Sequence, residues 1–135
     1  MDIRVLVVDD EPQINEITRA MLSKGGYESD GVTDPRKVVA QLKEHEYHLV
    51  ILDMMMPRMG GFPVLEFLKT LEQRPKVIMI TANEGSRHKA YAEMLGVTDY
   101  LRKPFPMEVL LEAVRRALAP PEEEKPARRA AKKKT

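Results

Sequence analysis

Short apolar runs that alternate with segments of helical periodicity constrain the fold of this chain more than any other feature. Three runs, at residues 3–8, 49–52 and 77–80, are rich in β-branched side chains and are typical of strands buried on both faces of a sheet. Weaker patterns predict two more strands, over Tyr27–Val32 and Asp99–Arg102. The sequence therefore predicts five strands.

The segments that follow the predicted strands have the spacing of amphipathic helices. The first ends at Gly25-Gly26, and the second begins at Asp34-Pro35, where an aspartate cap and a proline in the first turn favour a helix start. A fourth helix is predicted over Arg87–Leu95. The apolar positions of the other four are Ile14, Ile17, Met21 and Leu22; Val38, Val39 and Leu42; Val64, Leu65, Leu68 and Leu71; and Val109, Leu110, Ala113, Val114 and Ala117.

This alternation of strand and helix, repeated five times, predicts the fold class. Right-handed crossovers between parallel strands place helices on both faces of one sheet, which is a doubly wound α/β architecture. In such sheets ligands bind outside the carboxyl ends of the strands, where the strand order reverses. We therefore look for function at that edge.

The composition indicates one globular domain followed by a charged tail. A chain of 135 residues suits one core, and the absence of cysteine excludes disulfides and thiolate metal sites. Residues 1–118 carry 16 basic and 18 acidic side chains, whereas residues 119–135 carry 6 and 3. We predict a domain over residues 1–119 and a disordered tail or linker over residues 120–135.

The same composition limits the classes of partner. The mildly acidic body gives no sign of a nucleic-acid-binding face, and only the basic tail could contact a nucleic acid or an acidic protein. No segment is apolar over the length of a membrane span, and the N-terminus lacks the order of a secretion signal. We expect a cytoplasmic protein with no membrane partner.

Charged and polar residues follow the predicted strands at the edge where a ligand would bind. Asp9 and Asp10 follow the first strand and Asp53 ends the third, while Thr81 ends the fourth and Lys103 follows the fifth. Oxygen ligands with room for water favour a hard divalent cation, and we expect Mg²⁺. Such a cation can hold a phosphoryl group by its oxygens, and a carboxylate can accept that group as a nucleophile.

Four motifs in this order, VVDDEP, LVILDMMMP, ITA and YLRKPF, resemble those of the receiver domain of two-component response regulators. The resemblance covers Ile3 to Leu118, and any one motif alone would be weak. It implies a flavodoxin-like, five-stranded parallel sheet with strand order 2-1-3-4-5. It also implies a stand-alone, chemotaxis-type switch that catalyses its own phosphorylation and dephosphorylation and is not otherwise an enzyme.

The resemblance also assigns metal and phosphoryl ligands. Asp53 would be the phosphoacceptor, and Mg²⁺ would be held by Asp10 directly, by Asp9 directly or through water, by Asp53, and by the backbone carbonyl of Met55. Lys103 would pair with Asp53 or with the incoming phosphoryl oxygens. These carboxylates repel one another without the cation, so the empty site is electrostatically strained.

Other positions would switch the domain or tune the lifetime of its phosphorylated state. Thr81 would hydrogen-bond the phosphoryl group, Tyr100 would turn inward as Thr81 moves, and Pro104 would follow a cis peptide bond that aims Lys103. Met55 and Asn83 would flank the path of the attacking water. Two departures from the family pattern are Gly60, where an acid usually caps the next helix, and Val97, where a smaller residue is common.

The implied partners are a sensor histidine kinase or phosphotransfer protein, and a downstream protein that docks on the face built from Arg87–Ala117. The domain would be a monomer or a weak, activation-dependent dimer. Three alternatives stay open: a receiver fragment of a longer regulator with a DNA-binding or other effector domain, a docking module that is never phosphorylated, and a metal-dependent phosphatase with its nucleophile after the first strand. The phosphatase would need an acid two residues beyond Asp9, the place of Glu11. Glu11 is otherwise expected to be an ordinary acid at a helix N-terminus.

Overall fold

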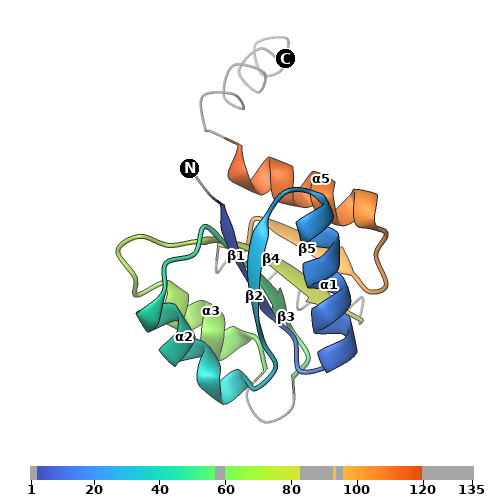
Figure 1. Cartoon of the computed structure of the whole chain (residues 1–135). Coiled ribbons are helices and arrows are strands. Elements are labelled where there is room, and N and C mark those ends of the chain that lie inside the picture. The colour runs from blue at the N-terminus through green and yellow to red at the C-terminus, as the bar shows by residue number, and fades with distance from the viewer. Residues whose placement is uncertain (1–2, 57–59, 83–92, 94–95, 120–135) are drawn as a thin grey trace, which may run out of the picture.

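The computed structural model describes residues 3–56, 60–82, 93 and 96–119, and its described core is a five-stranded parallel sheet (Figure 1). The strands are β1 (Arg4–Val8), β2 (Glu28–Val32), β3 (Leu49–Asp53), β4 (Lys76–Thr81) and β5 (Asp99–Arg102). Their order across the sheet is β2-β1-β3-β4-β5, and every neighbouring pair is parallel. The predicted fold class and strand order are confirmed.

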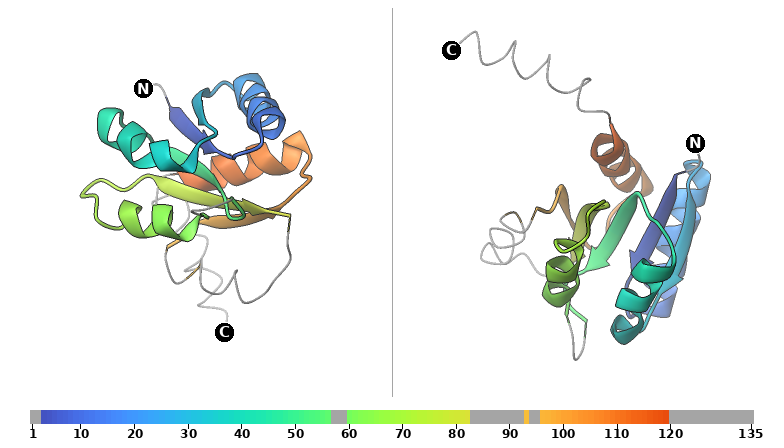
Figure 2. Two further views of the ribbon diagram at one scale, coloured as in Figure 1. Left: turned by 90° about the horizontal axis from the view of Figure 1, so that it is seen from below. Right: turned by 90° about the vertical axis from the view of Figure 1, so that its left-hand side faces the viewer.

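Helices cover both faces of the sheet. The helical elements are α1 (Pro12–Lys24), the 3-10 turn η1 (Pro35–Lys37), α2 (Val38–Glu44), α3 (Phe62–Leu68) and α5 (Met107–Leu118). Viewed along the sheet, α2 and α3 lie on one side of the strands, and α1 and α5 lie on the other (Figure 2). The helix predicted over Arg87–Leu95 lies outside the described residues except for Glu93, and so does the tail at 120–135.

Side chains of successive strand residues point to opposite faces and build two separate cores. Leu6 and Val8 of β1 pack with the residues of α2 and α3, whereas Val5 and Val7 pack with Leu22 of α1 and with α5. All five residues of β3 are buried. This arrangement explains why the central strands are continuously apolar instead of alternating with polar residues.

Two of the predicted apolar helix faces are wrong in detail. Ile17 is 50% exposed and Val109 is 45% exposed, although the apolar pattern places both on buried helix faces. The residues of α1 that face the sheet are Asn15, Thr18 and Leu22, spaced three and four apart as one helix face requires. The backbone places these positions against β1 and β2, so two polar side chains are buried where the apolar pattern indicated a neighbouring face.

The helix starts agree better with the sequence. Asp34 caps η1 by accepting a hydrogen bond from the Arg36 backbone N–H at 3.0 Å. The start of α3 has Gly61 at its cap position with no side-chain hydrogen bond, as the missing acid at Gly60 predicts. Helix α3 ends at Leu68, so Leu71 lies beyond it and is only partly buried against the core.

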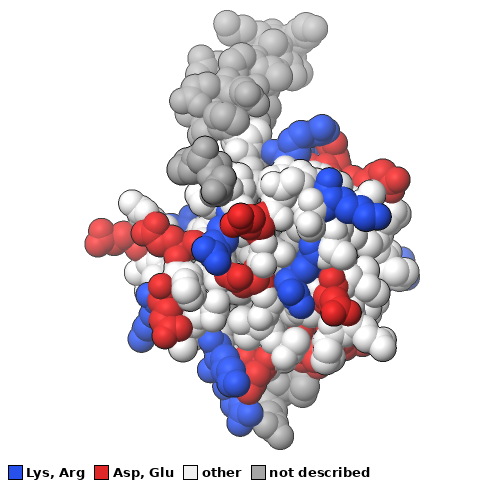
Figure 3. All heavy atoms as spheres, viewed as in Figure 1, with Lys and Arg blue, Asp and Glu red and all other residues white. Residues whose placement is uncertain are grey.

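The surface of the body carries charges of both signs. On the face shown in Figure 3, basic and acidic side chains are interspersed and do not gather into one patch. Ion pairs join Arg4 to Asp30 at 3.2 Å and Arg116 to Asp99 at 2.6 Å. Among the described residues, no helix combines the length and the apolar character needed to cross a bilayer.

Candidate phosphoryl-acceptor site

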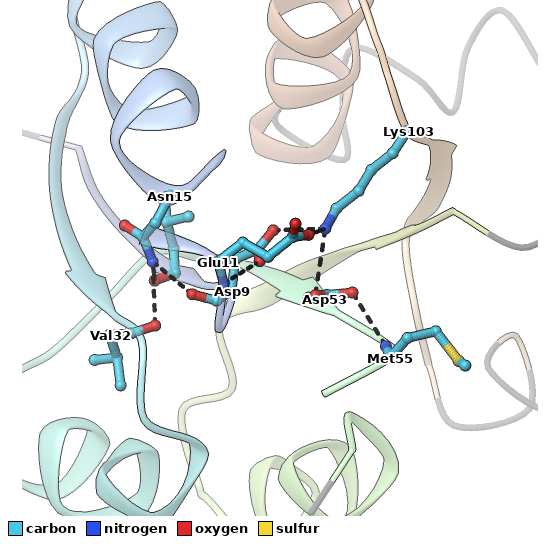
Figure 4. Close-up of polar contacts among 8 residues, drawn as sticks. Asp9, Glu11, Asn15, Val32, Asp53, Met55 and Lys103 are labelled. Atoms are coloured by element: carbon cyan, nitrogen blue, oxygen red, sulfur yellow. Dashed lines mark hydrogen bonds and ion pairs between the residues drawn. The ribbon is translucent and has the colours of Figure 1, made fainter. Parts of the chain in front are cut away.

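The parallel sheet brings the predicted site residues to one edge. Asp9 directly follows β1, Asp53 is the last residue of β3, and Thr81 is the last residue of β4. These three side chains are 0%, 1% and 0% exposed. Lys103 follows β5 and extends its ammonium toward Asp9 and Asp53 (Figure 4). Residues nearly a hundred positions apart in sequence therefore share one small site.

Three carboxylates converge there. Asp9, Asp10 and Asp53 each offer an oxygen, and these oxygens lie within 4.8 Å of one another. Asp9 and Asp53 are buried, while Asp10 is partly exposed. An all-oxygen set with one solvent-facing member matches the ligand preference of Mg²⁺, which keeps part of its water shell. The donor chemistry therefore fits the cation that the sequence predicted.

Lys103 is the cation that the structure places among these acids. Its Nζ atom lies 2.8 Å from Asp9 Oδ2, 3.3 Å from Asp53 Oδ2 and 3.3 Å from Glu11 Oε1. Burial alone would lower the pKa of Lys103, but the hydrogen bond to Asp9 and the charges of Asp53 and Asp9 outweigh it, so the pKa is raised and the ammonium stays protonated. The peptide bond between Lys103 and Pro104 is cis.

The environment of Asp53 disfavours its charged form. Burial and the nearby Asp9 charge raise the pKa of Asp53 to about 6. The Met55 backbone N–H and Lys103 lower this pKa, but they do not cancel the rise. Asp53 Oδ1 accepts that N–H at 3.1 Å, while Oδ2 faces Lys103. One oxygen of Asp53 is therefore held by the backbone, and the other faces the charged groups.

The side chains of Thr81 and Tyr100 are in contact near the carboxyl end of β4. Tyr100 is paired across the sheet with Met79, two residues before Thr81, and its hydroxyl oxygen is buried. Burial raises the pKa of Tyr100, and the contact with the Thr81 hydroxyl works in the opposite direction. Tyr100 as a whole is therefore half-buried, with its hydroxyl oxygen shielded from solvent. The predicted lifetime-tuning residue Asn83 lies outside the described residues.

Met55 is held by its backbone and exposes its side chain. The backbone N–H binds Asp53, whereas the side chain is 54% exposed and points away from the carboxylates in Figure 4. The thioether therefore offers no polar group toward Asp53.

Two residues of the site are underestimated or missed by sequence reasoning. The sequence predicts Glu11 to be an ordinary helix N-terminal acid, yet it shares Lys103 with Asp9 and Asp53. The apolar pattern assigns no role to Asn15, yet its buried amide lies beneath the Asp9 backbone. The one signal for Asn15 was a polar residue next to the apolar positions of a predicted helix.

Comparison with known proteins identifies the family of this chain. The family model described as the response regulator receiver domain matches residues 5–115. The chain belongs to this receiver family. Receiver domains act in two-component systems and accept a phosphoryl group on an aspartate.

The relatives include longer proteins and receiver structures. The receiver domain is 36% identical over 114 residues to regulatory protein VanRB of Enterococcus faecalis, covering 84% of this chain and 51% of that protein. It is 36% identical over 115 residues to transcriptional regulatory protein HprR of Escherichia coli, covering 85% and 51%. The chain thus spans about half the length of the curated relatives it matches.

Solved structures support the same assignment. Chemotaxis protein CheY4 of Vibrio cholerae superposes with a TM-score of 0.81 at 28% identity, covering 87% of this receiver and 100% of that chain. A CheY-like receiver domain protein of Methanospirillum hungatei superposes with a TM-score of 0.81 at 27% identity, covering 86% and 93%.

Proposed function

We propose that this chain is a phosphorylation switch in which Asp53 accepts a phosphoryl group from the phosphohistidine of a sensor kinase or phosphotransfer protein. The observation that carries the proposal is the convergence of Asp9, Asp10 and Asp53 within 4.8 Å, with Lys103 Nζ 3.3 Å from Asp53. This arrangement lies at the edge of a receiver fold, where doubly wound sheets bind ligands. We expect the switch to work in the cytoplasm.

The residues of the site have distinct parts in the transfer. An oxygen of Asp53 attacks phosphorus, the bond from phosphorus to the donor histidine nitrogen breaks, and the electron pair leaves with the imidazole. Asp9, Asp10 and Asp53, with the Met55 carbonyl, would hold Mg²⁺, which would supply positive charge to the phosphoryl oxygens. Lys103 can follow the new negative charge because its ammonium is a mobile point charge with three donors.

Phosphorylation would act on the rest of the domain through Thr81 and Tyr100. The phosphoryl group adds about two negative charges and new acceptor oxygens beside Thr81. Because Tyr100 lies against Thr81, a shift of the threonine hydroxyl changes the packing of β5. We propose that β5, α5 and the segment 87–95 form the face that a downstream protein reads, through a shift between two packings.

The experiment that tests the proposal is phosphorylation by a small molecule. The full chain is incubated with Mg²⁺ and a small acyl phosphate and its mass is measured, beside the Asp53→Asn variant. We expect a gain of one phosphoryl group in the wild type and none in the variant. An equal mass gain in both proteins would show that Asp53 is not the phosphoacceptor. No mass gain in either protein would favour the docking module that is never phosphorylated.

The exposed Met55 side chain gives a prediction about the lifetime of the phosphorylated state. Replacing Met55 with asparagine is expected to speed dephosphorylation about fivefold, because one hydrogen bond worth about 1 kcal/mol could orient the attacking water. The measurement is loss of phosphoryl mass with time after the acyl phosphate is removed. Met55→Leu is the control, since it changes shape without adding a polar group; an unchanged or slower rate in Met55→Asn would contradict the prediction.

A second candidate function is that of the receiver half of a longer regulator. Longer relatives, HprR among them, of which the matched segment is about half, favour it, and the tail at 120–135 would then be a linker to an effector domain. Reading the complete gene distinguishes the two: a reading frame that stops at Thr135 supports the single-domain switch. The oligomeric state, expected to be a monomer or a weak activation-dependent dimer, is measured by light scattering with and without beryllofluoride.

A further inference from the structure

The strongest unassigned feature of the described structure is the buried side chain of Asn15. It lies on α1, is 1% exposed, and sends its amide nitrogen toward the ends of two strands. Nδ2 lies 3.2 Å from the Val7 carbonyl oxygen, 3.2 Å from that of Asp9 and 3.1 Å from that of Val32 (Figure 4). Since the amide has only two hydrogens, the three acceptors must share them.

These carbonyls mark the point where β1 and β2 end beneath the acidic site. Val32 is the last residue of β2, and its carbonyl also accepts the backbone N–H of Asp9 at 3.2 Å. The Asn15 side-chain amide and the Asp9 backbone N–H thus both donate to the Val32 carbonyl. Buried carbonyls left without donors cost free energy, so the Asn15 amide stabilises this particular backbone arrangement.

The same asparagine closes the turn that carries the acids. The Asn15 backbone N–H donates to the Glu11 carbonyl at 2.9 Å, and the Glu11 N–H donates to Asp9 Oδ1 at 3.0 Å. The other oxygen of Asp9 faces Lys103 at 2.8 Å. The Asn15 side chain therefore holds the Asp9 end of this turn through the Asp9 carbonyl, while the helix backbone holds the Glu11 end. The Asn15 amide nitrogen donates to backbone carbonyls and not to the carboxylate oxygens that converge on the site.

Neighbouring residues hold Asn15 in this orientation. Arg19 Nε donates to Asn15 Oδ1 at 2.9 Å, which leaves the amide nitrogen directed at the carbonyls. On β2, Gly31 gives both side chains room: a Cβ there would lie 2.2 Å from Asn15 Oδ1 and 2.6 Å from Arg19 Nε. Glycine weakens a strand and often marks a close approach, and here the approaching group is the Asn15–Arg19 pair.

We propose that Asn15 is a positioning residue of the Mg²⁺ site, which sets the spacing of Asp9 and Asp10 by fixing the backbone beneath them. The inference rests on the proposed function, because it concerns the same carboxylates. It predicts that loss of the Asn15 amide weakens Mg²⁺ binding. Groups that orient metal ligands typically change affinity roughly 10- to 100-fold when removed.

The test is titration of the full chain with Mg²⁺ alone in a calorimeter, with the unfolding midpoint measured beside it. Asn15→Leu keeps a similar volume and removes the donor, and we expect its Kd for Mg²⁺ to rise about tenfold. Thr18→Val is the matched control: Thr18 is equally buried on the same helix face. If Asn15→Leu and Thr18→Val both lose stability but only Asn15→Leu shows a raised Kd for Mg²⁺, the result supports Asn15 as a positioning residue.

A second variant leaves Asn15 itself unchanged. Gly31→Ala adds a methyl group that displaces the Asn15–Arg19 pair, and its Kd is expected to rise about threefold, less than in Asn15→Leu because Arg19 can move aside. If Asn15→Leu does not fold, Gly31→Ala decides the question against the same control. If the wild type binds Mg²⁺ and the Kd values of Asn15→Leu and Gly31→Ala equal that of Thr18→Val, this inference is wrong but the proposed metal site stands. If the wild type does not bind Mg²⁺, both the proposed metal site and this inference are wrong.

Discussion

Replacing Lys103 with methionine is expected to destabilise the metal-free protein by about 3 kcal/mol, the usual result of removing one partner from a buried ion pair. The Lys103 side chain is 12% exposed, and its ammonium faces Asp9, Asp53 and Glu11. Methionine keeps an unbranched chain of similar shape but removes the ammonium that lies among those carboxylates. The measurement is urea unfolding in the presence of a chelator.

Mg²⁺ should restore much of this loss. The cation replaces the missing positive charge, so saturating Mg²⁺ is expected to stabilise Lys103→Met more than it stabilises the wild type. Phosphorylation by an acyl phosphate should nevertheless stay slow, because Lys103 holds its ammonium 3.3 Å from Asp53, where it can neutralise incoming phosphoryl oxygens. Lys43→Met, an exposed lysine on α2, is the control and should change stability by no more than about 0.5 kcal/mol. Equal stability losses in the two variants would contradict the role of Lys103.

The sheet was predictable from the sequence because strands that are buried on both faces leave a recognisable pattern. Such strands are continuously apolar, and the run of five buried residues in β3 is recognisable without any structure. The strand order came from the resemblance to receiver domains, since helical periodicity says nothing about which strands are neighbours. The acids at the ends of β1 and β3 were predictable for the same reason: in parallel sheets all carboxyl ends meet at one edge.

Side-chain partners within helices were less predictable. The apolar pattern of α1 pointed to Ile14 and Ile17, whereas the face against the sheet carries Asn15 and Thr18. A buried asparagine is stable only because carbonyls at the ends of β1 and β2 lie within reach, and those carbonyls are defined by tertiary structure. The Glu11 contact with Lys103 joins residues 92 positions apart, and no local pattern encodes it.

Asp53→Asn is expected to abolish phosphorylation and at the same time to stabilise the metal-free protein by about 2 kcal/mol at pH 7. The pKa of Asp53 is raised to about 6, chiefly by burial, so the folded state disfavours the charge that neutral pH imposes. Asparagine has the same shape and keeps an oxygen for the Met55 N–H, but it carries no charge. The measurement is the free energy of unfolding in chelator, with exposed Glu16→Gln on α1 as the control.

The sign of this difference should depend on pH and on Mg²⁺. A raised pKa means that the wild type gains stability relative to the variant as the pH falls through about 6 to below about 4, where the carboxyl is neutral in both the folded and the unfolded state. Mg²⁺ at a hundred times its Kd adds about 2.7 kcal/mol to a protein that binds it. The variant lacks one of three converging carboxylates and gains less, so the order of stability reverses. A variant that is less stable than the wild type in chelator would show that Asp53 is not strained when the site lacks its cation.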